Sequence, residues 1–391
     1  MPRRLFVTLH RWFGLGAAAF LFIAGTTGAV ISWDHELDAW LNPHLFKARN
    51  AGPARPIPEL IQRVESADPR VRVTFAPLAL EPGQALTVSV EPRVDPASGT
   101  HFQPGYNQVT VDPATGEIQG RREWGRVSLA RENLLPFLYK LHYSLHMPRA
   151  WGIELGVWFM GLLALAWVAD SFVVLWISFP SLQAWAQSFR FRFRQGGFRL
   201  VFDLHRSGGV WVWPLVLLLA ITSVGMNLNR EVMRPVVSLL SKLTPSPLAD
   251  RPVAPPNEPR EPLVALTDVV HLAQAEARRR AWPAPPGAAF LSTEVGVWGV
   301  GFFEPGRGHG DGGLGNPWLY FDSRTGQPVG ADVPGTGSAG DFVMQAMFPV
   351  HSGRILGLPG RILISLLGLA VSTFCATGVW LWLRRLKARP R

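Results

Sequence analysis

The sequence has little cysteine and few charged side chains, and both shortages limit what the protein can be. Cys375 is the single cysteine, so the chain alone cannot form a disulfide framework, a cysteine-based zinc site or an iron–sulfur cluster. The lack of a C-x-x-C-H motif excludes covalent attachment of a c-type haem. Charged residues make up 17% of the chain, below the roughly 25% of soluble domains, whereas 48% of the residues are hydrophobic.

Four apolar stretches are each long enough to cross a lipid bilayer as a helix. They run over Trp12–Ser32, Leu155–Ser178, Ser207–Leu228 and Ile362–Leu383. Asp170 is the one charged residue within them. We therefore expect an integral membrane, α-helical protein with a four-helix transmembrane bundle. With their flanking residues, the four transmembrane helices are predicted over 1–32, 146–178, 205–228 and 351–383.

The net charge of +10 is concentrated in arginine-rich segments at both chain ends and in the middle. Residues 1–11, 179–206 and 384–391 hold this excess, and the two long segments between the helices are nearly balanced. Basic loops stay on the cytoplasmic side of a membrane. We therefore expect a bacterial inner (cytoplasmic) membrane protein with cytoplasmic termini, a cytoplasmic basic loop over 179–204 and a basic tail over 384–391. Because the lipid bilayer explains the charge, no nucleic-acid partner is expected.

Spacings of His, Arg and Gly repeat at the entrances to the predicted helices. Arg follows His directly and Gly comes four residues after it, at His10 and again at His205. Arg lies three residues and Gly six residues after His, at His146 and again at His351. The sequence therefore predicts a tandem duplication in which each half reads helix, external segment, helix. Equivalent helices run in the same direction, so the halves are expected to be related by a pseudo-two-fold axis along the membrane normal.

The two external segments, 33–145 and 229–350, are expected to form two small α+β periplasmic domains. Two helical patterns and four strand patterns support this, namely Ile57–Glu65 and Leu263–Arg280, then Val71–Phe75, Leu86–Val90, Gln108–Val111 and Trp318–Phe321. An Asp-x-x-Thr-Gly sequence begins at Asp112 and again at Asp322. Its glycine suits the positive φ of a hairpin turn, so each segment is predicted to contain this turn.

Five of the ten histidines lie at the helix entrances. The expected topology places His10 and His205 at the cytoplasmic ends of the first and third helices. It places His146 and His351 at the external ends of the second and fourth. His142 lies one helical turn before His146, so both rings are expected to face the same way. Ionisable groups at bilayer depth are costly unless they are paired or used, which makes these histidines candidates for function.

Two imidazoles on facing helices can hold one haem iron axially, and helical bundles often build cofactor sites in this way. The stacked, duplicated histidines therefore predict two haem b groups, both held non-covalently. Three roles stay open for His142: an alternative axial ligand, a residue that supports the ligand, or a residue that contacts substrate. Without a cofactor, the same histidines would be positions of a proton relay.

Four arginines accompany these histidines: Arg11, Arg206, Arg149 and Arg354. They could neutralise haem propionates through charge-assisted hydrogen bonds. They could equally be topology anchors whose guanidinium groups reach the lipid headgroups. Asp170 lies near the cytoplasmic end of the second apolar stretch, where we expect it to bond to Arg11 or Arg206.

At these motifs the sequence resembles the PepSY-associated transmembrane family, and the resemblance covers nearly the whole chain. It rests on Leu9-His10-Arg11-Trp12-Phe13-Gly14-Leu15, Leu141-His142-Tyr143-Ser144-Leu145-His146, Asp203-Leu204-His205-Arg206 and Val350-His351-Ser352-Gly353-Arg354. The Asp-x-x-Thr-Gly turns look like the PepSY hairpin, which implies that both external domains are PepSY-like. The resemblance further implies that His10 and His205 hold a cytoplasmic-side haem, and that His351 holds an external-side haem with His146 or His142.

The family includes iron-regulated inner-membrane proteins, and its FoxB-like di-haem members are ferric-siderophore reductases. The resemblance therefore implies an oxidoreductase that passes electrons from an unidentified cytoplasmic donor to a periplasmic ferric siderophore or similar iron chelate. Iron would be released as Fe(II), and the chemistry would belong to the haem rather than to an acid or base of the chain. Two other classes stay open. One is a membrane-tethered PepSY module that regulates a peptidase or senses a ligand without haem, and the other is a small-solute permease.

Overall fold

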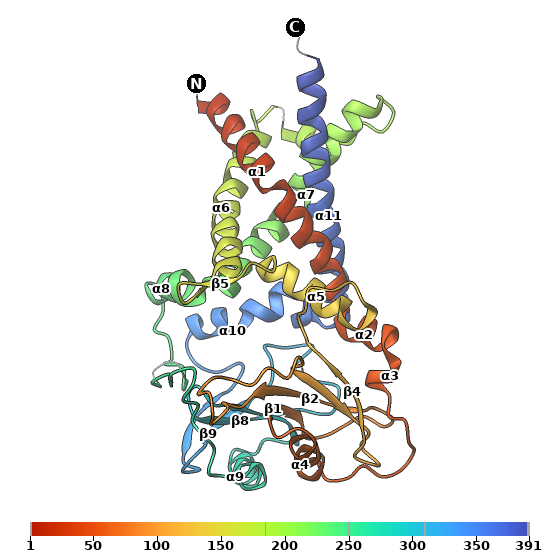
Figure 1. Cartoon of the computed structure of the whole chain (residues 1–391). Coiled ribbons are helices and arrows are strands. Elements are labelled where there is room, and N and C mark those ends of the chain that lie inside the picture. Colours follow the sequence, from red (N-terminus) through yellow and green to blue (C-terminus); the bar gives the residue numbers. More distant parts are fainter. Residues whose placement is uncertain (1, 184, 249–250, 309, 389–391) are drawn as a thin grey trace. The chain divides into compact units, whose positions relative to one another are not determined.

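The structure is a computed structural model that describes residues 2–183, 185–248, 251–308 and 310–388 (Figure 1). Arg389 and Arg391 of the predicted basic tail lie outside these residues. The chain divides into two compact units. The membrane unit comprises Met1–Asp34, Leu138–Lys242 and Ala346–Arg391, and the soluble unit comprises His35–Phe137 and Leu243–Gln345.

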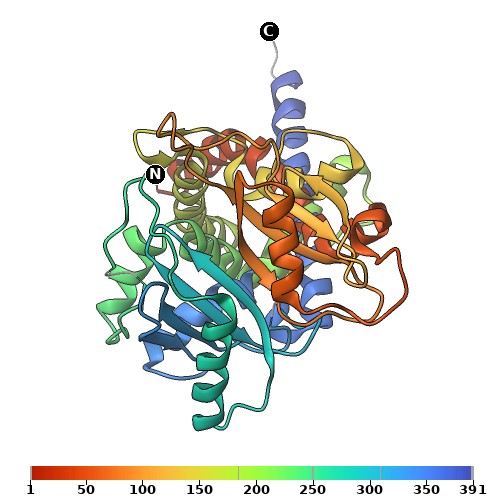
Figure 2. The same ribbon diagram turned by 60° about the horizontal axis from the view of Figure 1, so that its bottom comes forward.

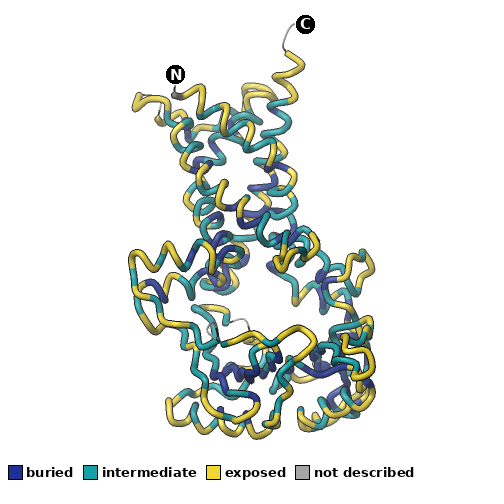
Figure 3. The backbone as a smooth tube through the Cα atoms, turned by 60° about the vertical axis from the view of Figure 1, so that its left-hand side comes forward, coloured by how far each residue is buried: buried dark blue, intermediate teal, exposed yellow. Residues whose placement is uncertain are grey.

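Within the described residues, four helices of the membrane unit are long and apolar enough to cross a bilayer: α1 (Pro2–Ile31), α6 (Leu155–Ser178), α7 (Gly197–Asn227) and α11 (Leu358–Lys387). Contacts join α1 to α6, α6 to α7, α7 to α11 and α11 back to α1, so the four form a closed bundle. Many large apolar side chains of these helices are exposed, for example Trp12, Phe172 and Leu366. Exposed and half-buried positions recur along the backbone of the helices (Figure 3). Such a surface requires an apolar solvent, which confirms the predicted helical membrane protein.

The helix bounds differ from the predicted ones at three entrances. The second and fourth spans begin at Leu155 and Leu358, later than predicted, and the third begins at Gly197, earlier than predicted. The segment predicted as a basic loop over 179–204 therefore already contains the first turns of α7, together with a short 3-10 helix, η1 (Trp185–Phe189). The carboxylate of Asp203, in α7, pairs with Arg192 at 2.6 Å and holds this segment to the helix.

A separate helix precedes each of the two late-starting spans. Before α6, helix α5 (Arg131–Ser144) ends where Leu145 and His146 adopt positive φ values of 52° and 54°, and a short hairpin of β5 (Arg149–Ala150) and β6 (Ile153–Glu154) follows. Before α11, helix α10 (Ala339–His351) is followed by the 3-10 turn η3 (Arg354–Leu356). The prediction that His142 and His146 share one helical face is therefore wrong, because the left-handed residues end the helix between them.

Helices α1 and α11 approach most closely at two glycines. A methyl group on Gly25 would lie 2.6 Å from the Gly368 carbonyl oxygen, and one on Gly368 would lie 2.5 Å from the Gly25 carbonyl oxygen. Small residues at such crossings let membrane helices pack without a hydrophobic driving force. Near the end of α1, the buried Arg361 donates to the carbonyl oxygen of Ser32 at 2.9 and 2.7 Å and lies over the Trp33 ring. These contacts fix α1 against α11.

The soluble unit is built on one eight-stranded antiparallel sheet. The first half contributes β1 (Val71–Pro77), β2 (Leu86–Pro92), β3 (Gln108–Val111) and β4 (Ile118–Arg122), and the second contributes β7 (Pro286–Ser292), β8 (Val297–Phe302), β9 (Trp318–Asp322) and β10 (Pro328–Asp332). Helices α4 (Ile57–Ala67) and α9 (Leu266–Arg279) precede the two sets of strands and lie against the same face of the sheet (Figure 2). Four further short helical segments are α2 (Asp34–Leu41), α3 (Pro43–Phe46), η2 (Asn229–Met233) and α8 (Arg234–Ser238).

The two halves of the soluble unit repeat the order helix and four strands, but they are not two separate domains. Strands β1 and β7 pair, with Phe75 opposite Phe290 and Ala76 opposite Ala289, so that one sheet runs through both halves in the order β10-β9-β8-β7-β1-β2-β3-β4. This corrects the prediction of two small domains. Each half has its own apolar core, one around Leu60 on α4 and one around Val269 on α9.

The two predicted hairpin turns are confirmed. The Asp112 carboxylate accepts hydrogen bonds from the backbone N–H groups of Ala114 and Thr115, and Gly116 has a φ of 79°. The Asp322 carboxylate accepts from Arg324 and Thr325 in the same way, and its glycine has a φ of 72°. Side chains that bond their own backbone are typical of such turns, and this is why the same five-residue motif occurs in both halves.

Candidate functional site

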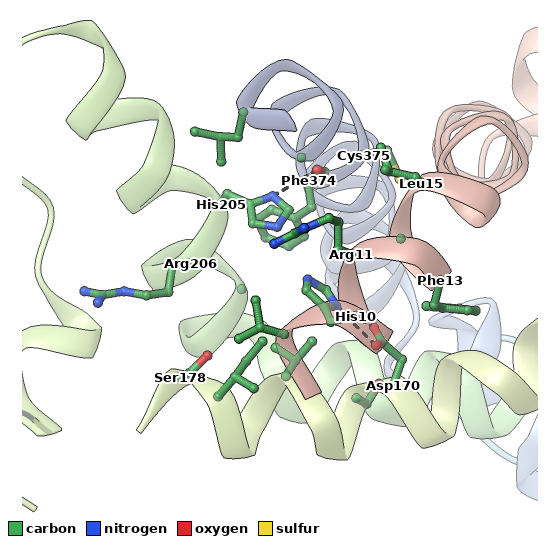
Figure 4. A pocket seen from close by; sticks show the side chains of 18 of the residues that line it. His10, Arg11, Phe13, Leu15, Asp170, Ser178, His205, Arg206, Phe374 and Cys375 are labelled. Atoms are coloured by element: carbon green, nitrogen blue, oxygen red, sulfur yellow. Dashed lines mark hydrogen bonds and ion pairs between the residues drawn. The ribbon is translucent and has the colours of Figure 1, made fainter. Parts of the chain in front are cut away.

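Two of the predicted site residues meet near the end of the membrane unit that holds the chain termini. His10 on α1 and His205 on α7 lie with their ring centroids 6.2 Å apart and their planes tilted by 45° (Figure 4). We call these two residues the terminal histidine pair. They belong to helices that are far apart in sequence, and the packing of the bundle brings their rings together, as the repeated motifs predicted.

A second pair lies at the opposite end of α1. His142, in the last turn of α5, and His351, the last residue of α10, have ring centroids 6.2 Å apart and planes tilted by 58°. We call them the distal histidine pair. Neither lies within a spanning helix, and burial lowers the pKa of both imidazoles, to about 3 for His351. Both rings are therefore neutral near pH 7, which is the form that binds metals.

His146 does not take part in the distal pair. It follows the end of α5 in a left-handed conformation, and the ring that faces His351 is that of His142. The repeated spacing of His, Arg and Gly had matched His146 with His351. The first half carries a longer connection between the helix end and the next span, so the equivalent ring lies four residues earlier in the sequence.

All four paired rings are held through the same nitrogen, Nδ1. His10 donates to the Asp170 carboxylate at 2.9 Å, and His205 donates to the Phe374 carbonyl oxygen at 3.0 Å. His142 donates to the Ala24 carbonyl oxygen at 2.9 Å. Three threonine hydroxyls also lie 3.1 Å from a histidine Nδ1, namely Thr377 at His205, Thr27 at His142 and Thr222 at His351.

These hydrogen bonds fix the tautomer of each ring. Each of the three threonine hydroxyls donates its proton to a carbonyl oxygen four residues earlier in its own helix, at 2.6 to 2.9 Å. The hydroxyl oxygen can then only accept from the histidine, as a carboxylate or a carbonyl oxygen must. Nδ1 therefore carries the proton in all four rings, and Nε2 carries a lone pair. Histidines that bind metals are held in this way by a hydrogen bond from their second nitrogen.

The spacing of the rings fits an iron held between them. A metal–imidazole bond is about 2.0 Å long and its nitrogen lies about 1.1 Å from the ring centroid, so two axial rings on one metal have centroids about 6.2 Å apart. Both histidine pairs have this separation. Among the described residues, no group of three or more His, Cys, Asp or Glu side chains could hold a bare metal ion. A haem macrocycle would supply the remaining ligands of an iron held by two such rings.

A cavity of about 520 Å³ surrounds the terminal pair. Gly14 and Gly209, each one helical turn after a histidine of this pair, line it, and a methyl group on either would have no atom within 4 Å. This is the space that a flat ring would need beside the backbone. Two other glycines make room for the imidazoles: a methyl group on Gly28 would lie 2.9 Å from the His142 ring, and one on Gly378 would lie 3.0 Å from the His205 ring.

Basic side chains line the same cavity. Arg11 and Arg206, both predicted, line it (Figure 4). Arg3 and Arg385, which the sequence did not single out, line it as well. Arg206 donates through its Nη2 to the Gln187 carbonyl oxygen, and its buried Nε has no partner among the described residues. Figure 4 shows this side chain directed away from the two imidazoles, and its guanidinium group lies over the Phe202 ring.

The other two predicted arginines have acidic partners. Arg149 is largely exposed in the β5–β6 hairpin, 3.7 Å from the Glu154 carboxylate. Arg354 is buried and lies 3.7 Å from the Asp34 carboxylate.

Asp170 also differs from its prediction, because it bonds to His10 and not to Arg11 or Arg206. The motif Thr-Gly, present at Thr27 and at Thr377, was the sequence signal for the groups that hold the rings, but its role was not predicted.

The two histidine pairs are spaced along the length of one helix. Helix α1 contributes His10 to the terminal pair, and through Ala24 and Thr27 it holds His142 of the distal pair. These positions are roughly 20–25 Å apart along the helix axis. The two pairs therefore lie near opposite ends of the bundle.

A comparison with protein families matches residues 7–385 to the family described as the PepSY-associated TM region. The match spans nearly the whole chain, and the protein belongs to this family. None of the curated proteins matches the sequence.

Proposed function

Starting from membership of this family, we propose that the protein is an inner-membrane di-haem b reductase. It passes electrons from a cytoplasmic donor to a periplasmic ferric siderophore or a similar iron chelate, and iron leaves as Fe(II). The observation that carries the proposal is the pair of facing imidazoles at each end of the bundle, each with a ring spacing of 6.2 Å and a fixed Nδ1–H tautomer. When bound, haem supplies reversible one-electron transfer between ferric and ferrous iron.

The residues of the chain have separate tasks in this proposal. His10 and His205 hold one haem, and His142 and His351 hold the other. The threonines and Asp170 orient the four rings, so that each presents its Nε2 lone pair. Arg11 and Arg206, which line the cavity, would neutralise propionates at the terminal pair. The glycines beside the rings keep the space open.

The direction of transfer follows from the proposed orientation. The arginine-rich segments favour a cytoplasmic position for the terminal pair and a periplasmic position for the distal pair. The chain would then be a tandem duplication whose halves are related by a pseudo-two-fold axis, since the same helices and strands occur in the same order in both. Each histidine pair takes one ring from each half, as this symmetry requires.

Reduction releases the metal because siderophores bind through hard oxygen donors, which hold Fe(III) more strongly than Fe(II). No residue of the chain need act as an acid or base in this step. The chain must bring the chelate within electron-transfer distance of the distal pair and keep competing oxidants away.

A reoxidation experiment tests the proposal. The full-length protein, purified from haem-replete cells in detergent, is reduced with a limiting amount of dithionite and mixed with a ferric hydroxamate or catecholate siderophore. We expect the haem absorption bands to return to the oxidised form while a ferrous-specific chelator traps Fe(II), in one-to-one proportion. The gallium complex, which cannot be reduced, is the control. Protein that binds haem but reduces no ferric siderophore would contradict the proposed activity.

A further inference from the structure

The four paired histidines differ in the kind of oxygen that accepts their Nδ1 proton. Three rings donate to neutral oxygens, from a threonine hydroxyl alone or with a backbone carbonyl. His10 alone donates to a carboxylate, that of Asp170, at 2.9 and 3.1 Å from its two oxygens. The difference lies within the terminal pair, because its other ring, His205, has Thr377 and the Phe374 carbonyl oxygen as acceptors.

Asp170 stands where the other half of the chain has a threonine. Helix α6 reads Trp167-Val168-Ala169-Asp170-Ser171, and helix α11 reads Phe374-Cys375-Ala376-Thr377-Gly378. In both, an aromatic residue comes three positions before the side chain that bonds to the histidine, and a small residue follows it. The same place on two corresponding helices therefore holds a neutral acceptor in one half and an anionic acceptor in the other.

Orientation of the ring does not require the anionic acceptor. Threonine holds each of the other three rings in the same tautomer at a similar distance. Asp170 is 9% exposed and is the one charged residue of the α6 span, where burying a carboxylate costs far more than burying a hydroxyl. The additional cost indicates a role that threonine cannot fulfil.

A carboxylate behind a metal-bound imidazole makes the ring a stronger donor to the metal. A stronger donor stabilises the more positive, oxidised state of the iron. Hydrogen bonding to the ligand is one of the few means by which a protein sets the potential of a haem. On the basis of the proposed function, we propose that Asp170 is a positioning residue that lowers the reduction potential of the haem at the terminal pair and so favours electron transfer toward the distal pair.

The arginines of the terminal cavity act in the opposite sense. Arg3, Arg11, Arg206 and Arg385 line it, and their positive charge favours the reduced state of the iron. Haem propionates offset part of this charge. The effect of Asp170 is therefore measured by changing Asp170 within one site, and not by comparing the two sites.

The experiment measures the haem midpoint potential by optical redox titration of the full-length protein. A His142→Ala background removes the distal ligand and leaves the terminal haem to be titrated alone. In this background Asp170→Asn keeps the size and a hydrogen-bond acceptor but removes the charge. We expect the oxidised-to-reduced ratio at a fixed ambient potential to fall at least tenfold, a rise of about 59 mV for one electron. Ser171→Ala, which removes a neighbouring hydroxyl that bonds to the Trp167 carbonyl oxygen, is the matched control and should leave the potential unchanged.

The reciprocal variant places a second carboxylate in the site. Thr377→Asp should lower the potential of the same haem, because His205 then also donates to an anion. This variant decides the question if Asp170→Asn loses its haem. An unchanged potential in Asp170→Asn protein that retains haem, or in Thr377→Asp protein, would overturn the role of Asp170. Absence of haem from the parent protein would instead overturn the proposed function.

Discussion

The soluble unit and the membrane unit bury polar side chains in different ways. In the soluble unit, buried carboxylates pair with arginines: Asp38 lies 2.7 Å from Arg122, and Asp68 pairs with Arg70 at 2.8 Å. In the membrane unit, four histidine rings face each other in two pairs, and within the described residues their hydrogen bonds all run through Nδ1. The first arrangement satisfies its groups within the protein. The second leaves one nitrogen of every ring for a group from outside.

From this difference we expect substitutions in the soluble unit to affect stability and substitutions at the histidine pairs to affect the proposed cofactor. Changes in the soluble unit remove contacts between parts of the chain, so they should lower its stability and leave the haem spectrum unchanged. If the histidine pairs hold haem as proposed, changes there remove bonds to it, so they should lower haem content with a smaller effect on the fold. Each prediction below tests one side of this contrast, beginning with the largest effect.

The largest effect is expected at the distal pair. His351→Ala should lower the haem content from about two to about one per chain, because one ring cannot hold the iron in a six-coordinate, low-spin state. His146→Ala is the matched control, since His146 lies nearby but outside the pair, and should retain both haems. The pyridine haemochrome assay of purified protein measures the ratio. Loss of haem from His146→Ala, with none from His142→Ala, would reverse the assignment of the ligand.

A smaller effect is expected from a single methyl group beside a ring. Gly28→Ala places its methyl 2.9 Å from the His142 ring, which must move and would weaken the proposed bond to haem iron. We expect partial loss of the distal haem, seen as a lower haem-to-protein ratio. Gly16→Ala on the same helix is the control, because its methyl would meet no atom within 4 Å. Equal haem content in the two variants would contradict the close fit of this ring.

The soluble unit should respond in the opposite way. Leu60→Ala empties a fully buried position in the core around α4 and should cost 2–5 kcal/mol, a typical range for such a truncation. Hydrogen exchange of the full-length protein should then be faster in β1, β2 and β3, while the Soret band is unchanged. A loss of haem as large as that of His351→Ala would show that the two units do not respond separately.

The smallest effect is a pH dependence at the start of α10. Burial opposes ionisation of Asp341, but hydrogen bonds from Ser338 and Thr244 outweigh it and lower its pKa to about 2. Because the folded pKa is below the ordinary value of 3.8, the ionised carboxylate stabilises the fold above that value, and this contribution is lost as the pH falls toward 2. The Tm difference between wild type and Asp341→Asn, measured in detergent, should shrink between pH 6 and pH 3. A difference that is independent of pH would exclude this role.

Much of the membrane unit could be predicted from the sequence. The apolar stretches predict the four spans because a bilayer imposes length and composition on a helix. The equal spacing around His10 and His205 predicts that these rings correspond, and the structure brings them together. The histidine opposite His351 could not be chosen from the motif. The Arg and Gly that follow His351 have counterparts after His146, so the motif pointed to His146. The positive φ values of Leu145 and His146, which end helix α5 before His146, correspond to no pattern in the sequence.

Other features depend on contacts between distant segments. The hydrogen bond between Asp170 and His10 joins α6 to α1, and the sequence around either residue does not indicate the other as its partner. Strand β7 contains one Gly and two Ala, which have low strand propensity, and it forms because it is paired on both edges, with β1 and with β8. The junction of the two halves in one sheet was therefore not predicted either.

The most direct test of this account is the haem content of the full-length protein purified from haem-replete cells, measured together with its reduced-minus-oxidised spectrum. The account predicts about two low-spin b-type haems per chain, falling to about one in His205→Ala and in His351→Ala, and to none in the double variant. Colourless protein, or a haem content that these substitutions leave unchanged, would contradict it.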